Sequence, residues 1–181
     1  MPNWITLEEN LKSRGYTVSR FATGSEAADY LNSQIDHTTV GFGGSVTLEQ
    51  IGLYDRLATH NDVCWHWKKG LLATSAQAEV YVSSANGVAE TGEIVNIDGT
   101  GNRVASLCFG HKRAYLVVGA NKIGPTYAAA LAHAQQVAAP KNAERLGKDP
   151  DDISHILMVL QKRPGGISKM EVVLVEEDLG Y

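Results

Sequence analysis

The sequence is poor in the features that mark several common classes of protein. Only two of its 181 residues are cysteines, Cys64 and Cys108, and their wide separation argues against a disulfide framework or a zinc site. The longest apolar run falls far short of the ~20 residues that a membrane span needs. Residues 1–15 are polar and amphipathic, unlike a signal peptide. We therefore expect a cytoplasmic protein without membrane contact, in which both thiols are buried and reduced.

Positive charge is also scarce. The chain has 16 Lys and Arg against 20 Asp and Glu, which gives a net charge of −4. The pairs Lys68-Lys69 and Lys112-Arg113 are too short to form the basic face that nucleic-acid binding requires. We therefore expect no nucleic-acid partner. An acidic protein can still bind a small anion locally through backbone N–H groups.

Several catalytic signatures are missing as well. The first glycine cluster has Val46 where a dinucleotide fingerprint needs its third glycine, and there is no Walker Gly-Lys-Ser/Thr. The Gly-x-Ser-x-Gly of serine hydrolases is also absent. His111, His133 and His155 lie too far apart for a metal motif. We expect no metal and no cofactor.

What the sequence does contain is an alternation of strand-like and helix-like segments. This alternation predicts one α/β domain over residues 1–181, with a mostly parallel sheet and helices on both faces. Two final strands, over 155–160 and 170–175, are joined by a segment rich in Pro and Gly, which predicts a closing C-terminal hairpin. A helical turn or loop is expected over 140–147. The other strands are predicted over 16–21, 39–42, 62–67, 79–83, 94–97 and 114–118.

The first candidate site is a glycine turn within Val40–Thr47, between a strand and a helix. Two consecutive glycines let the backbone approach a ligand closely. Thr47 and Gln50 fit a capping box that starts the helix. Such a junction directs free N–H groups at one point, which suits a phosphate or a carboxylate. We favour this role over a purely structural turn because open sheets bind ligands at the carboxyl ends of their strands. The candidate ligand-binding residues here are Gly43, Gly44, Ser45 and Thr47.

The second candidate site is the polar segment Gly92–Arg103. Its carboxylates could act as general acid or base, its amides could bind a ligand, and its Arg could clamp an acidic group. The alternative is structural: Asp98 and Asn102 cap a helix, and Arg103 pairs with a surface acid. Spacing alone does not decide between the two. The candidate catalytic residues are Asp98 and Glu93, and the candidate ligand-binding residues are Asn96, Gly99, Gly101, Asn102 and Arg103.

A third group follows the strand predicted to end near Gly119. Asn121 and Lys122 should lie at the same sheet edge as the two glycine turns, where Lys122 could neutralise a ligand anion. A solvated lysine is the alternative. In Trp65-His66-Trp67, strand alternation favours buried indoles over a catalytic His66.

With these residues identified, the chain resembles the lactate-utilisation (LUD-domain) family. The most specific match is the string Asn-Ile-Asp-Gly-Thr-Gly-Asn-Arg at 96–103. The resemblance implies a ribose-isomerase/CoA-transferase-like α/β fold. It also implies a link to the oxidation of lactate to pyruvate beside subunits that carry iron–sulfur clusters. The other matching stretches are 40–53, 85–109, 117–123, 139–146 and 172–181.

Two departures limit what the resemblance implies. Residues 86–100 are similar to a segment of methylthioribose-1-phosphate isomerases, but the catalytic Asp and Lys of those enzymes fall on Asn86 and Ile97. Many LUD-domain relatives also have a cysteine cluster where this chain has Gly147–Asp152. Neither isomerase chemistry nor electron transfer is therefore carried over.

The sequence as a whole predicts a protein that binds a small acidic or phosphorylated metabolite at the carboxyl edge of its sheet. An alternative is a non-catalytic subunit that docks onto lactate-oxidising partners through residues 140–152 and 176–181. A phosphosugar isomerase is a third hypothesis. The sequence does not give the oligomeric state, and a homodimer is the default expectation.

Overall fold

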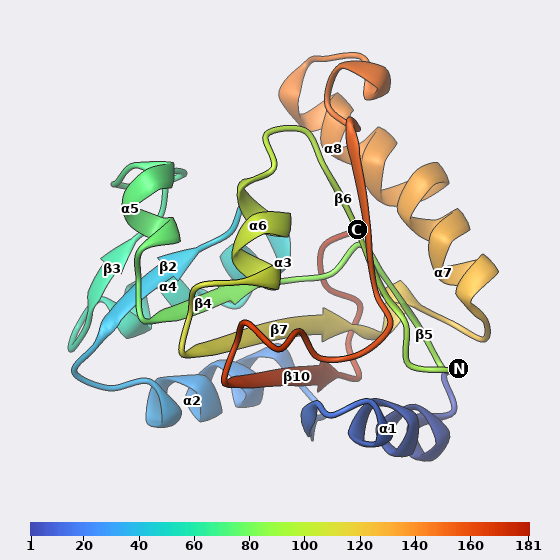
Figure 1. The fold of residues 1–181 in the computed structure, drawn as a ribbon, viewed down its shortest axis with the longest axis horizontal. Coiled ribbons are helices and arrows are strands. Elements are labelled where there is room, and N and C mark those ends of the chain that lie inside the picture. The colour runs from blue at the N-terminus through green and yellow to red at the C-terminus, as the bar shows by residue number, and fades with distance from the viewer.

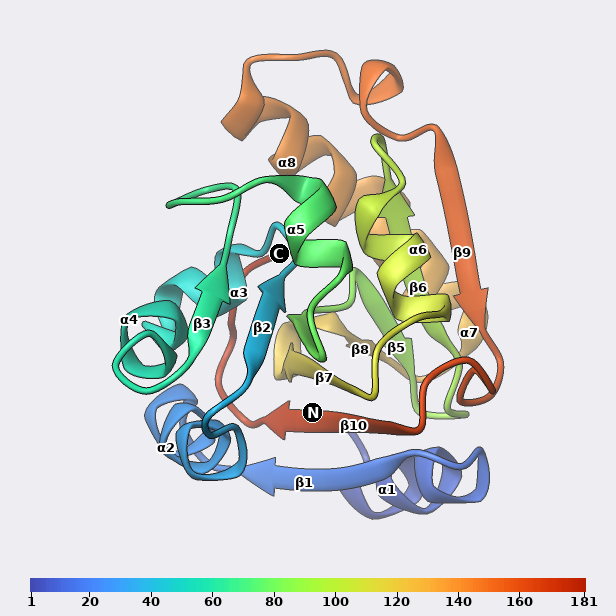
Figure 2. The same cartoon turned by 60° about the vertical axis from the view of Figure 1, so that its left-hand side comes forward.

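The computed structural model describes residues 1–181, which form a six-stranded sheet, a smaller four-stranded sheet and eight α-helices (Figures 1 and 2). The strands of the main sheet are β1 (Thr17–Phe21), β2 (Thr39–Phe42), β3 (Asp62–Cys64), β4 (Val80–Ser83), β7 (Arg113–Gly119) and β10 (Lys169–Val175). The second sheet contains β5 (Gly87–Ala89), β6 (Ile94–Asp98), β8 (Ile123–Gly124) and β9 (Ile156–Leu160). The helices are α1 (Trp4–Ser13), α2 (Gly24–Gln34), α3 (Val46–Gln50), α4 (Leu53–Leu57), α5 (Leu72–Ala76), α6 (Asn102–Cys108), α7 (Tyr127–His133) and α8 (Ala139–Leu146).

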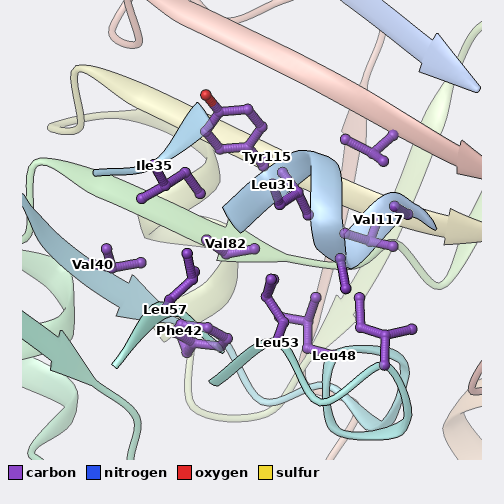
Figure 3. Close-up of a cluster of buried hydrophobic side chains, with 14 of the residues drawn as sticks. Leu31, Ile35, Val40, Phe42, Leu48, Leu53, Leu57, Val82, Tyr115 and Val117 are labelled. Atoms are coloured by element: carbon purple, nitrogen blue, oxygen red, sulfur yellow. The ribbon is translucent and has the colours of Figure 1, made fainter. Parts of the chain in front are cut away.

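The main sheet is parallel throughout, in the order β1-β10-β7-β4-β2-β3. Two of its inner strands, β7 and β10, are buried at all but their first position, as strands covered on both faces are. On β7, Tyr115 and Val117 pack with α2, α3 and α4 on one face (Figure 3). Leu116 and Val118 pack on the other face with α1, α6 and the second sheet. The structure confirms the predicted α/β fold with a mostly parallel sheet.

The predicted closing hairpin is wrong, although both of its strands exist. β10 lies between β1 and β7, and parallel neighbours use both of its edges. β9 instead pairs antiparallel with β6 in the second sheet. The burial of the two strands agrees with this, because β9 is only half-buried whereas β10 is almost completely buried. The short linker suggested that β9 pairs with β10, but both edges of β10 are already paired with β1 and β7.

Three local details also differ from the sequence prediction. The helix that follows β2 is divided at Gly52, which has φ +63°. Its first part is capped by Ser45 rather than Thr47, because Ser45 Oγ accepts the Leu48 N–H at 3.2 Å. Residues 140–146 are helical: a π-helical turn over Ala134–Ala138 joins α7 to α8 just before Pro140, which has no N–H to donate.

The two cysteines differ in exposure, and the helices are too short or too polar to span a membrane. Cys64 is buried as predicted, whereas Cys108 is exposed and its Sγ lies 3.3 Å from Met158 Sδ. None of the helices has both the length and the apolar composition needed to cross a bilayer.

Candidate functional site

A cavity of about 610 Å³ opens at the carboxyl edge of the main sheet, beyond β2, β4 and β7. The chain leaves β2 toward β3 on one side and leaves β4 toward β7 on the other, so a crevice forms between β2 and β4, as is usual for ligand sites in open α/β sheets. Figure 1 shows α6, β6 and α8 gathered on one side of the main sheet, and residues of all three line the cavity. The two glycine turns, distant in sequence, therefore meet in one space.

The turn after β2 supplies unused backbone donors. The Gly43 N–H donates to Val82 O at 2.9 Å and so extends the sheet. The N–H groups of the next four residues, Gly44–Thr47, have no acceptor in the protein, and these four residues line the cavity. Gly43 does not line it. A Cβ there would lie 2.6 Å from Ser83 Oγ, so Gly43 is required for packing rather than for direct ligand contact.

Lys122 also lines the cavity and is only 3 % exposed. Its Nζ donates to Thr47 Oγ1 at 2.8 Å and to Ser84 Oγ at 2.9 Å. Burial, with a smaller effect of the Arg103 guanidinium, lowers the pKa of Lys122 to about 7. The alternative of a solvated lysine is therefore wrong.

The second glycine turn combines structural and cavity-lining roles. Asp98 Oδ2 accepts the N–H of Arg103 at 2.9 Å and that of Val104 at 3.3 Å, so Asp98 caps α6 as the structural alternative proposed. Asp98 also lines the cavity. Arg103 does not pair with an acid: its Nη2 donates to Ile97 O at 2.5 Å and to Asn86 Oδ1 at 3.1 Å. The Arg103 charge thus remains available to a ligand. Gly99 and Asn102 line the cavity beside it.

Glu93 and Asn96, both on or next to β6, do not line the cavity. Glu93 precedes the strand and forms an ion pair with Arg14, with Glu93 Oε1 2.5 Å from Nη2. Asn96 is fully buried, and neither of its side-chain polar atoms has a hydrogen-bond partner. The structure separates both residues from the other candidates, and Glu93 is not placed to act as an acid–base group in the cavity.

Asn121 and Gly101 position segments next to the cavity but do not line it. Asn121 Oδ1 accepts the Leu179 N–H at 3.0 Å and its Nδ2 donates to Gly180 O at 3.3 Å, which fixes the C-terminal segment against the sheet. Gly101 has φ +90° and starts α6. Neither lines the cavity.

The sequence prediction missed the outer wall of the cavity, which α8 and the following residues provide. The Arg145 guanidinium lies 4.4 Å from the centre of the Trp67 ring, and its Nε donates to Tyr181 Oη at 3.0 Å. Burial, followed by the Arg145 charge, lowers the pKa of His66, which favours the neutral form of this lining imidazole. We expected only a short helical turn or a loop over 140–147, whereas these residues belong to an amphipathic helix that carries basic residues.

The cavity is more basic than the rest of the chain. Its lining contains four Lys or Arg residues and two carboxylates, whereas the whole chain has a net charge of −4. The basic residues are Arg103, Lys122, Arg145 and Lys148, and the acidic ones are Asp98 and Asp152. This local excess of positive charge favours an anionic ligand.

Asn86 and Ile97, at the positions of the isomerase catalytic residues, also lie side by side on the cavity wall. Asn86 Oδ1 accepts the Ile97 N–H at 2.9 Å. Neither side chain can transfer a proton at ordinary pH. The site therefore lacks the acid and the base of that reaction.

Comparisons with known proteins agree with this fold. The family profile described as the LUD domain matches residues 6–180. No curated protein matches the sequence. Among solved structures, the crystal structure of a DUF162 family protein from Deinococcus radiodurans is similar, with a TM-score of 0.61, 14 % sequence identity and coverage of 94 % of each chain. At that identity the likeness shows a shared fold.

Proposed function

The chain belongs to the LUD domain family, and on this premise we propose that its cavity binds a small acidic or phosphorylated metabolite. The family is linked in general to lactate utilisation, which favours an organic acid or a phosphorylated compound of organic-acid metabolism. The protein would bind this compound at the carboxyl edge of its main sheet.

One observation carries the proposal: unused donors of two kinds converge in a cavity that has excess positive charge. The N–H groups of Gly44–Thr47 can donate to several oxygens of one phosphate or carboxylate. Lys122 adds a buried cation and Arg103 adds a guanidinium that no acid neutralises. Such a constellation suits a negative group that has lost its water.

The size of the cavity supports a metabolite rather than a bare ion. Its volume of about 610 Å³ lies within the roughly 300–1,000 Å³ typical of small-molecule sites. Trp67 and Ala139 provide apolar surface beside the polar groups. A ligand with a carbon skeleton and one anionic end would match this combination of apolar and polar lining.

The alternatives rank below this proposal. Two segments, 140–152 and 176–181, were expected to dock onto a lactate-oxidising iron–sulfur or flavin partner, and both contribute to the cavity wall. The lining residues from them include Asn142, Arg145, Lys148, Gly180 and Tyr181. A phosphosugar isomerase would need proton-transferring groups at Asn86 and Ile97. We therefore place the docking subunit second and the isomerase third.

Ligand-induced thermal stabilisation tests the proposal. Lactate, pyruvate, inorganic phosphate and sugar phosphates are added separately to the wild type, to Gly44→Asp and to Gly165→Asp. A Gly44 side chain would enter the cavity near Trp67, whereas Gly165 lies outside the cavity and has open space around it. We expect at least one compound to raise the Tm of the wild type and of Gly165→Asp but not that of Gly44→Asp. Stabilisation by none of them, or equal stabilisation of Gly44→Asp, would overturn the proposal.

A further inference from the structure

We infer that Lys122 is a nucleophilic amine that forms a Schiff base with a carbonyl compound carrying an anionic group. This inference rests on the proposed function, because the anionic group would be bound by the same cavity. It adds a covalent reaction and a substrate class to a site otherwise described only as an anion-binding cavity.

The hydrogen bonds around Lys122 leave one direction of its amine unused. Ser84 Oγ donates to Val117 O at 2.6 Å, and Thr47 Oγ1 donates to Leu179 O at 3.2 Å. Since both hydroxyl protons are directed at backbone carbonyls, each hydroxyl offers only lone pairs to Lys122 Nζ. The amine must therefore donate to both. A neutral amine has two N–H bonds, so these contacts use both of them and leave the nitrogen lone pair without a partner.

Nothing near Lys122 holds it in the charged form. Its two hydrogen-bond partners are neutral hydroxyls, and it forms no ion pair with a carboxylate. Burial and the Arg103 charge lower its pKa to about 7. Near neutral pH a lowered pKa increases the share of molecules that carry the free amine, which is the form that attacks carbonyl carbon. An exposed lysine is almost entirely protonated at that pH.

The amine also lies close to the anion-binding donors. The position that a Gly180 Cβ would occupy is 3.1 Å from Lys122 Nζ and 3.1 Å from Thr47 N. The two nitrogens therefore border the same small space, which the glycine leaves open. A ligand whose anionic group accepts from Gly44–Thr47 would place a nearby carbonyl carbon next to Lys122.

The reaction needs no additional reagent. The nitrogen lone pair attacks the carbonyl carbon to give a carbinolamine, the nitrogen then loses its proton, and the carbinolamine hydroxyl leaves as water. The products are an imine and one water molecule, with no net oxidation or reduction. Two sources share this chemistry, a 2-oxo acid and a phosphorylated aldehyde, and both carry the required anion beside a carbonyl group.

Borohydride trapping tests the inference. The wild-type protein is incubated with pyruvate or with glyceraldehyde 3-phosphate, reduced with sodium borohydride, and analysed by intact mass and peptide mapping. We expect one borohydride-reduced adduct per chain, located at Lys122. The yield of this adduct should fall when lactate or inorganic phosphate competes for the cavity. The compound that gives the adduct identifies the source. Lys122→Met should form no such adduct, whereas Lys112→Arg, which changes an exposed lysine paired with Glu79, should retain it.

Thermal shifts with lactate and inorganic phosphate, which cannot form imines, separate the two proposals. If either compound stabilises the protein but no carbonyl compound labels Lys122, the inference is overturned and the proposed function stands. Labelling spread evenly over surface lysines also overturns it. If no compound stabilises the protein and none labels Lys122, both proposals fail. Peptide mapping of the wild type decides the question even if Lys122→Met does not fold.

Discussion

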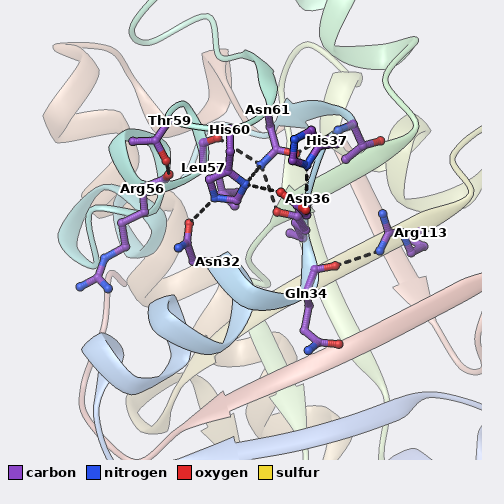
Figure 4. Close-up of polar contacts among 12 residues, drawn as sticks. Asn32, Gln34, Asp36, His37, Arg56, Leu57, Thr59, His60, Asn61 and Arg113 are labelled. Carbon is purple, nitrogen blue, oxygen red and sulfur yellow. Dashed lines mark hydrogen bonds and ion pairs between the residues drawn. The ribbon is translucent and has the colours of Figure 1, made fainter.

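The main sheet has an amino edge, where its parallel strands begin, and a carboxyl edge, where they end. Both carry clusters of polar side chains, but the hydrogen-bonding groups find partners within the protein to different extents. At the amino edge, His60 lies between Asp36 and Asn32, with Nδ1 2.8 Å from Asp36 Oδ1 and Nε2 2.9 Å from Asn32 Oδ1 (Figure 4). Asn61 accepts the Thr38 N–H and donates to backbone carbonyls of Ile35 and Leu57. These polar groups are partnered within the protein.

At the carboxyl edge several donors have no acceptor within the protein. The N–H groups of Gly44–Thr47 have no partner, and Lys122 has hydroxyls but no counter-ion. Leaving buried polar groups without partners costs free energy, so a protein retains them where a ligand completes them. Donors without acceptors, more than the number of polar residues, therefore distinguish the candidate site from the structural network at the amino edge.

The largest expected effect is on ligand binding when the surplus cation is removed. Lys122→Met should weaken binding of the stabilising anion roughly 10- to 100-fold, because a charge-assisted hydrogen bond contributes about 1.5–3 kcal/mol. Its free energy of unfolding at pH 7 should not fall, since an uncompensated buried charge is replaced by an apolar side chain of similar length. Calorimetric titration and urea unfolding measure the two quantities. Unchanged affinity with lost stability would assign Lys122 a structural role.

The second prediction concerns pH. Lys122 is protonated up to about pH 7 in the folded chain and up to its ordinary pKa of 10.5 in the unfolded chain. Between these values the unfolded chain binds more protons, so the Lys122 contribution makes the free energy of unfolding rise with pH, by up to about 1.4 kcal/mol per pH unit. Urea unfolding at pH 7, 8 and 9 should show this rise in the wild type relative to Lys122→Met. Parallel curves for the two proteins would contradict it.

At the amino edge a substitution should lower the free energy of unfolding and leave ligand affinity unchanged. Asn61→Ala removes the partner of the Thr38 N–H and two bonds to backbone carbonyls, and we expect a loss of about 2 kcal/mol in the free energy of unfolding. Ligand affinity should be unchanged, because Asn61 does not line the cavity. Lost affinity in a protein that remains folded would show that the two edges are coupled.

The smallest predicted effect separates backbone strain from obstruction of the site. Gly180 has φ +64° and Gly52 has φ +63°, so an alanine at either position should cost roughly 1 kcal/mol. Only at Gly180 would the added Cβ contact Thr47 Oγ1, at 2.5 Å, and approach Lys122 Nζ. Gly180→Ala should therefore lose more stability than Gly52→Ala and should also bind the anion more weakly. Equal behaviour of the two variants would remove Gly180 from the site.

The fold was largely predictable because its main strands carry their own signal. The continuous apolar run of β7 indicates a strand covered on both faces, and the alternation of strands and helices along the chain predicts a mostly parallel sheet. The pairing of β9 was not predictable in this way. Whether it joins β10 or β6 depends on which edges are free in the finished sheet, and the short linker before β10 indicated the wrong partner.

The site was predictable where a glycine turn or a basic residue lies shortly after a strand, as the turn after β2 and Lys122 do. Ser84 directly follows β4, but nothing else in the sequence distinguishes it. Its importance comes from the position of β4 between β2 and β7, which brings Ser84 Oγ to Lys122. Glu93 was wrongly grouped with Asp98 because the two are close in sequence. They lie near opposite ends of β6, so only one of them reaches the cavity.

A crystal structure of the protein grown with lactate or inorganic phosphate would show whether the cavity binds an anion. We expect an anion whose oxygens lie within hydrogen-bond distance of the N–H groups of Gly44–Thr47 and of Lys122 Nζ. This proposal for the cavity would be contradicted by a cavity that holds only water at saturating concentrations of these anions, or by an anion bound elsewhere with those donors unoccupied.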